Sequence, residues 1–96
     1  MSAIRCATAQ FQHRASDKAY NLTVIERFAE DAARRGARIV AFPEMCVTGY
    51  WHVRNLDRAG LEALAEAVTD GPSVRTLARL AMHYGLGVGE SLLVGK

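Results

Sequence analysis

The sequence of 96 residues lacks long hydrophobic runs and has no marked excess of one charge. Its longest aliphatic stretches, such as residues 39–42, fall far short of the roughly 20 residues that a membrane-spanning helix requires. Twelve lysines and arginines stand against ten acidic residues, and they are scattered rather than gathered into the basic stripe of a nucleic-acid groove. We therefore expect neither a membrane segment nor a nucleic-acid partner.

Cysteine is also scarce, and the N-terminus lacks the charged segment and apolar run of a secretory signal. Cys6 and Cys46 form no Cys-x-x-Cys pair and are too few for a disulfide framework. The expected compartment is the cytoplasm, where both side chains would stay thiols. His13, His52 and His83 form no pair at metal-ligand spacing, so we expect no metal site.

The glycines near the C-terminus do not form a nucleotide-binding motif. A Gly-x-Gly-x-x-Gly fingerprint that begins at Gly85 would require glycine at position 90, which is Glu90. Gly89 and Gly95 are one residue too far apart for a phosphate-binding loop, and no serine or threonine follows Lys96. We expect no nucleotide cofactor.

The first half of the sequence predicts a strand, a helix and a second strand. Residues 3–11 are mostly apolar and end in polar residues, which suits a buried strand. Ser16 or Asp17 is a candidate N-cap for a helix that ends at Gly36. Residues 38–42 predict the second strand. The apolar residues that recur at helical spacing are Ala19, Leu22, Ile25, Ala29 and Ala32.

The second half predicts two further helices and a third strand. Asp57 is a candidate N-cap for a helix that continues through Val68, and Ser73 is a candidate N-cap for a helix that ends at Gly85. Residues 86–94 predict the third strand. The resulting order is β-α-β-α-α-β, and its length and near-average composition fit at most one α/β domain.

The compact strand–helix–strand order favours two parallel strands. Pro43 ends the second strand because proline cannot donate to a β-ladder. Ligands bind at the carboxyl ends of parallel strands, so residues 44–55 are the candidate site. Glu44 is the most informative residue of this site. Its carboxylate lies beside the apolar Met45 and Val47 in the sequence, and burial of a carboxylate is costly unless it has an interaction partner or a catalytic role. The alternative is a loop glutamate in water.

Cys46 lies two residues after Glu44, so in an extended segment the two side chains share a face. One hypothesis makes Cys46 a nucleophile, and the other makes it a small packing residue. Transfer of the thiol proton to a carboxylate is about four pKa units uphill, and the carboxylate charge disfavours a thiolate further. A cationic group is therefore needed. The lysines are only Lys18, on the solvated helix, and Lys96, and an arginine is the other candidate.

The sequence Gly-Ala-Arg-Ile-Val-Ala-Phe-Pro-Glu-Met-Cys-Val-Thr-Gly-Tyr at residues 36–50 closely resembles the first signature block of the nitrilase superfamily of carbon-nitrogen hydrolases. The aliphatic strand before Phe-Pro-Glu and the Thr-Gly-Tyr after it make this block fairly specific. Residues 7–10, Asn21, the Gly71-Pro72 pair and the strand from Leu86 also lie at similar places in that family, so the likeness covers nearly the whole chain.

This resemblance implies the N-terminal part of a four-layer α-β-β-α sandwich and hydrolysis of a non-peptide carbon-nitrogen bond by a Glu-Lys-Cys triad. Glu44 matches the general base of the triad. The lysine and the nucleophilic cysteine belong to later blocks, expected beyond residue 96, and neither Cys6 nor Cys46 matches the nucleophile. Residues 1–96 are then an incomplete domain, which we expect to be inactive alone and unstable or self-associating.

The resemblance further implies a small-molecule substrate of nitrile, amide or carbamoyl type, no metal or organic cofactor, and a homodimer or larger homo-oligomer at full length. Two other hypotheses are a free-standing small α/β binding module and a truncated remnant without catalysis. A stop codon after Lys96 with a compact, monodisperse protein would favour the module. The same stop codon with poor solubility would favour the remnant.

Overall fold

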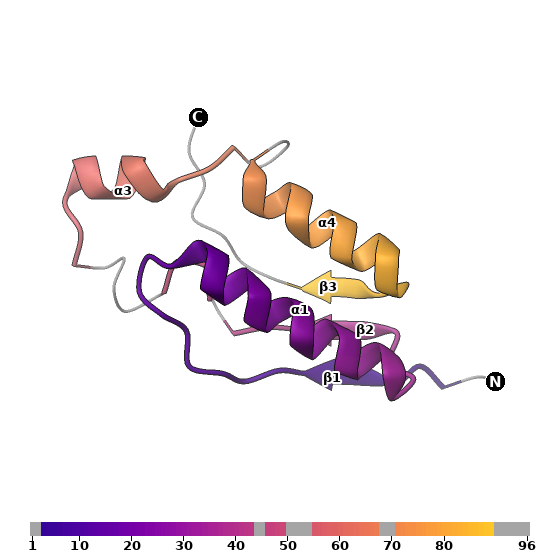
Figure 1. Ribbon diagram of the computed structural model, residues 1–96. Helices are drawn as coiled ribbons and strands as arrows, with labels where there is room; N and C mark the ends of the chain where they lie inside the picture. The colour runs from indigo at the N-terminus through magenta and orange to yellow at the C-terminus, as the bar shows by residue number, and fades with distance from the viewer. Residues whose placement is uncertain (1–2, 44–45, 50–54, 68–70, 90–96) are drawn as a thin grey trace.

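The computed structural model describes residues 3–43, 46–49, 55–67 and 71–89. These residues form a mixed α/β structure in which three short strands make one parallel sheet, in the order β1-β2-β3 (Figure 1). The described elements are, in chain order, β1 (Cys6–Thr8), α1 (Lys18–Arg34), β2 (Ile39–Ala41), α3 (Arg58–Leu64), α4 (Pro72–Tyr84) and β3 (Gly87–Gly89).

The sheet has one covered face and one open face. Ala7, Val40 and Val88 form the middle row of the register, and they are the half-buried or buried residues of their strands. The rows on either side are exposed: they are Cys6, Ile39 and Gly87, and Thr8, Ala41 and Gly89. Alternate residues of a strand point to opposite faces, so the middle row alone faces the helices. The parallel pairing of β1 with β2 confirms the prediction from the strand–helix–strand order.

Helices α1 and α4 lie side by side over the covered face and enclose the core (Figure 1). Ile25 of α1 is 0% exposed, Leu80 of α4 is 1% exposed and Val40 of β2 is 1% exposed. At the edge of this layer the Tyr84 hydroxyl donates a hydrogen bond of 3.2 Å to Glu26. The hydrophobic core therefore lies between two helices and one face of a three-stranded sheet.

The ends of α1 follow from local chemistry. Asp17 is the N-cap, as predicted, because its carboxylate accepts a hydrogen bond of 3.0 Å from the Tyr20 backbone N–H. The helix ends at Arg34, and Gly36 after it has a positive φ of 84°. The predicted apolar face is confirmed at its buried residues, which are Ile25, Ala29 and Ala32, and Leu22 is half-buried. Ala19 is exposed, contrary to the prediction, and Asn21 lies fully buried on the face toward the core.

Helices α3 and α4 begin near the predicted boundaries, but only α4 ends where it was predicted to end. Asp57 caps α3, as predicted, by accepting a hydrogen bond from the Gly60 N–H, but α3 ends at Leu64 rather than continuing through Val68. The prediction that Ser73 caps α4 is wrong. Gly71 is the N-cap, and Pro72 at the first position needs no hydrogen bond for its nitrogen. Gly85 ends α4 in the left-handed conformation, as predicted.

The strands are shorter than the sequence predicts. Residues 3–11 and 38–42 were expected as strands, whereas β1 and β2 have three residues each. The carboxyl end of β2 is limited by Pro43, which has no N–H with which to extend the ladder. Beyond the β1–β2 ladder, the Arg38 N–H donates to the Arg5 carbonyl at one end and the Ala9 N–H donates to the Ala41 carbonyl at the other. Residues 90–94 of the expected third strand lie outside the described residues.

Candidate active site at the carboxyl end of the sheet

The three parallel strands place their carboxyl ends at one edge of the sheet, where α1 also begins (Figure 1). Phe42 continues β2 by one residue, and its N–H donates a hydrogen bond of 3.0 Å to the Gly89 carbonyl. Glu44, the predicted general base, and Met45 lie outside the described residues, as do residues 50–54. The structure therefore describes the candidate site through the residues that flank Glu44 on both sides.

The four residues after that gap form a turn that is packed into the protein. Cys46 is 0% exposed, Val47 is 1% exposed and Thr48 is 4% exposed. The Thr48 hydroxyl has no hydrogen-bond partner within the described part of the chain. Most buried hydroxyls in proteins are hydrogen-bonded, so this one is a candidate contact for a group outside the described residues. We call residues 46–49 the β2 loop.

Asn21 joins the β2 loop to the segment that follows β1. Its side-chain amide donates a hydrogen bond of 2.7 Å to the Val47 carbonyl and another of 2.8 Å to the Arg14 carbonyl. Its side-chain oxygen accepts a hydrogen bond of 2.8 Å from the Arg14 N–H. One buried side chain therefore connects the polypeptide that leaves β1 with the polypeptide that leaves β2.

Two more contacts join the same segments. The Ser16 backbone N–H donates a hydrogen bond of 3.0 Å to the Thr48 carbonyl. Gly49 has a φ of +97°, and a Cβ placed there would lie 2.8 Å from His13 Cδ2. The half-buried ring of His13 thus occupies the space beside Gly49, so His13 is a packing residue of this edge rather than a surface histidine.

We expect Gly49→Ala to lower the free energy of unfolding by about 2–3 kcal/mol, since alanine at positive φ costs about 1–2 kcal/mol and the added methyl group must displace His13. Gly85→Ala is the matched control, because Gly85 also has a positive φ but nothing within 4 Å of its Cβ position. Urea denaturation should show a smaller decrease in the free energy of unfolding for Gly85→Ala than for Gly49→Ala. Adding His13→Ala should recover part of the Gly49→Ala loss, and equal losses for the two glycine variants would contradict the clash.

The two cysteines lie in different surroundings. Cys6 is exposed on the open face of the sheet, and Cys46 belongs to the buried hydrophobic core. Complete burial of Cys46 favours its interpretation as a small packing residue, because a nucleophile must be reachable by its substrate.

The sequence predicts that Lys18 lies on a solvated helix face, and the structure shows instead that its side chain is partly buried. Its Nζ donates a hydrogen bond of 2.6 Å to the Leu64 carbonyl and lies 2.5 Å from a carboxylate oxygen of Glu66. The same carboxylate accepts hydrogen bonds of 2.6 Å from both the N–H and the hydroxyl of Ser73. Glu66 therefore accepts a hydrogen bond from a backbone N–H in the first turn of α4, and its ion pair with Lys18 connects that turn to the start of α1.

Two opposing effects set the pKa of the Glu66 carboxyl. Burial raises this pKa, whereas the hydrogen bonds from Lys18 and Ser73 and the positive charge of Lys18 lower it. Because the lowering effects are the larger together, the pKa of the Glu66 carboxyl lies below its usual value. The Glu66 side chain is 9% exposed and that of Lys18 is 26% exposed, so the pair is only partly screened by water. The described contacts of Lys18 therefore commit it to a structural ion pair with Glu66.

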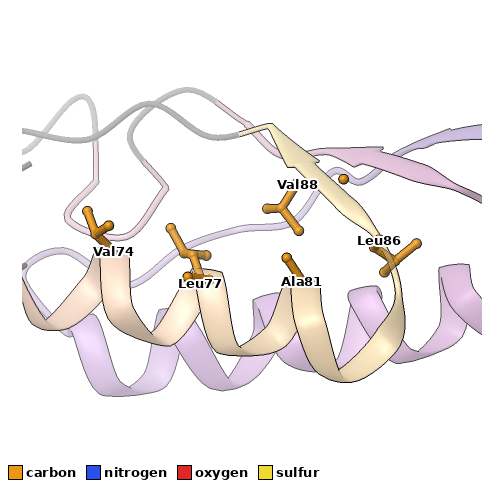
Figure 2. Close-up of a pocket in the computed structure, with 7 residues that line it drawn as sticks. Val74, Leu77, Ala81, Leu86 and Val88 are labelled. Atoms are coloured by element: carbon orange, nitrogen blue, oxygen red, sulfur yellow. The ribbon is translucent and has the colours of Figure 1, made fainter. Parts of the chain in front are cut away.

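The structure also contains an apolar groove of about 300 Å³ between α4 and β3. Figure 2 shows the side chains of Leu77 and Ala81 on the helix and of Val88 on the strand that line it. These walls carry no ionisable side chain, so the groove offers packing surface rather than a reaction centre.

No three His, Cys, Asp or Glu side chains among the described residues lie close enough together to hold a metal ion. No helix among those residues is both long enough and apolar enough to cross a membrane.

The family described as carbon-nitrogen hydrolase matches residues 5–89. The matched range begins just before β1, ends with β3 and contains every element described above. With this match over most of its length, the chain belongs to the carbon-nitrogen hydrolase family.

Proposed function

We propose that the chain is the N-terminal part of a hydrolase that cleaves a non-peptide carbon-nitrogen bond, with Glu44 as general base. The observation that carries the proposal is the place of Glu44 in the sequence, three residues after the end of the central strand β2 and within the range that matches the family. Ligand sites of parallel α/β sheets lie at such strand ends. The nucleophilic thiol and a lysine ammonium are then supplied by polypeptide beyond residue 96.

The proposed reaction begins when the Glu44 carboxylate takes the proton of the thiol. With an amide-type substrate the thiolate adds to the carbonyl carbon, and the nitrogen gains a proton and leaves as ammonia or an amine, which gives a thioester. With a nitrile the thiolate adds to give a thioimidate, and a first water adds to its carbon before ammonia leaves, which gives the same thioester. A further water then hydrolyses the thioester to an acid and the thiol. Proton transfer from a thiol to a carboxylate at ordinary pKa values is uphill by about 6 kcal/mol. A nearby ammonium lowers the thiol pKa, and burial raises that of the carboxyl, so the two effects together narrow the gap.

The open face of the sheet supports the four-layer architecture that we propose for the whole domain. It carries Ile39, which is 44% exposed, next to the small side chains of Ala41 and Thr8. A second sheet packed about 10 Å away would remove this face from water. The same argument disfavours a free-standing binding module, for which the face would remain exposed.

The experiment is a test of the protein expressed from the complete reading frame on a panel of nitriles, amides and carbamoyl compounds, with ammonia release as the readout. We expect release from at least one class. Cys6→Ser and Cys46→Ser should each retain activity within a few-fold, because neither thiol is the proposed nucleophile. A frame that stops at Lys96, or a Cys46→Ser protein that folds but releases no ammonia, would contradict the proposal.

A further inference from the structure

We infer that Asn21 is a positioning residue that fixes the β2 loop, and through it the segment that carries the proposed general base. The inference rests on the proposed function for its catalytic consequence, but its structural part concerns only described residues. Asn21 lies in the first turns of α1, on the buried face, and its side chain is 0% exposed. It therefore acts from a rigid helix on two irregular segments.

The chemistry of this position requires a carboxamide. The two donors of Asn21 serve the carbonyls of Val47 and Arg14, and its acceptor serves the Arg14 N–H. Aspartate has the same shape but offers no donor when ionised, and leucine offers neither donor nor acceptor. Either replacement leaves the buried Val47 carbonyl and the partly buried Arg14 carbonyl without this donor, and a buried carbonyl without a partner is costly inside a protein.

The neighbouring contacts fix the β2 loop at successive residues. Asn21 holds Val47, the Ser16 N–H holds Thr48, and the His13 ring lies against Gly49. Ser16 itself has a φ of +59°, a conformation that non-glycine residues adopt only where surrounding contacts hold them. The β2 loop is therefore positioned by α1 and the segment before it, as well as by the strand from which it leaves.

Position matters for a general base because the base must come within about 2.6–3.2 Å of the proton that it accepts. A displacement of about 1 Å can lower the rate by about 100-fold even when the reacting groups are unchanged. Residue 44 lies three positions before Val47, so a shift of the Val47 carbonyl is transmitted through very little intervening chain.

The test uses the complete protein with Asn21→Leu, and with Asn21→Asp as the second variant in case the first does not fold. The control is Ile25→Val, one turn later on the same buried face, which weakens packing without removing a hydrogen bond to the loop. Amide hydrogen exchange of Ser16, which donates to the Thr48 carbonyl, reports the position of the β2 loop in both variants. Exchange of Arg14 reports the lost contact in Asn21→Leu alone, because aspartate keeps an oxygen that accepts from the Arg14 N–H. In the Asn21 variants we expect the reporting amides to exchange at least about 10-fold faster than in Ile25→Val, after the difference in global stability between the variants has been taken into account.

The second readout is the steady-state rate. We expect kcat to fall about 10- to 100-fold in the Asn21 variants with KM changed less than about three-fold, and kcat of Ile25→Val to stay near wild type. Exchange no faster than in the control overturns the inference, and so does faster exchange with unchanged kcat. Full activity of Glu44→Gln would show that the general base is misassigned. The hydrogen-exchange result would still decide separately whether Asn21 holds the β2 loop.

Discussion

Glu44→Gln is expected to lower kcat for ammonia release by about 1,000-fold in the complete protein, because glutamine keeps the size of the side chain but cannot accept the thiol proton. Substrate binding does not depend on that proton transfer, so KM should change little. Glu44→Asp keeps a carboxylate on a shorter side chain, and its rate should lie between those of the wild type and the glutamine variant. Steady-state measurement of kcat and KM checks all three expectations.

The matched control is Glu62→Gln. Glu62 lies on α3, its side chain is 68% exposed, and its described partner is the exposed Arg58. This variant should retain the wild-type rate, because the change of charge lies on a solvated helix face. A Glu44→Gln protein that folds and releases ammonia as fast as the control would remove Glu44 from the mechanism.

Glu66→Ala is expected to destabilise the protein by about 2–3 kcal/mol, the largest effect we expect from any charged residue of the described structure. Loss of one partner of a buried ion pair costs about 3–5 kcal/mol, and an exposed pair is worth about 0–1 kcal/mol. The partial exposure of Lys18 places this pair between the two cases. The variant also removes the acceptor of the Ser73 N–H at the start of α4. Urea denaturation at neutral pH measures the change.

Glu62→Ala is again the comparison, and it should cost less than about 0.5 kcal/mol because both partners of its pair are exposed. A Lys18→Met/Glu66→Leu double variant should lose less stability than the sum of its single variants, since neither charge is then left buried alone. Equal costs for Glu66→Ala and Glu62→Ala would show that the Lys18 pair contributes no more than a surface ion pair.

The lowered pKa of Glu66 gives this contribution a pH dependence of known sign. In the unfolded chain the carboxyl titrates near its ordinary value of 4.5, and in the folded chain it titrates below that value. The stabilisation is therefore complete above the unfolded pKa and is lost as the pH falls from there through the folded pKa. The stability difference between wild type and Glu66→Gln should be constant near pH 7 and should shrink below pH about 4. A difference that grew on acidification would contradict the shift.

Much of the fold could be predicted because its determinants are local. Asp17 and Asp57 cap helices where a carboxylate can reach the N–H three residues later, and Gly85 ends α4 because glycine tolerates a positive φ. The parallel pairing followed from a helix between two apolar segments. The strand lengths could not be predicted, since apolar residues such as Phe11 pack on the core without joining a ladder.

The contacts of the candidate site were less accessible to sequence reasoning. The contact between Asn21 and Val47 joins residues that are 26 positions apart, and the pair of Lys18 and Glu66 joins residues that are 48 positions apart. No local sequence pattern predicts either contact. Asn21 nevertheless carries a local signal in the sequence. It is a polar residue on the buried face of an amphipathic helix, and such a residue normally requires hydrogen-bond partners inside the protein.

The most direct test of the account is peptide mapping by mass spectrometry of the complete protein, quenched with acid during turnover of a slowly hydrolysed amide. We predict an acyl thioester on a cysteine outside residues 1–96 in the wild type, formed at least about 100-fold more slowly in Glu44→Gln. An adduct on Cys46, or equal rates of adduct formation in the two proteins, would contradict the assignment of Glu44 as base for a thiol supplied by another part of the polypeptide.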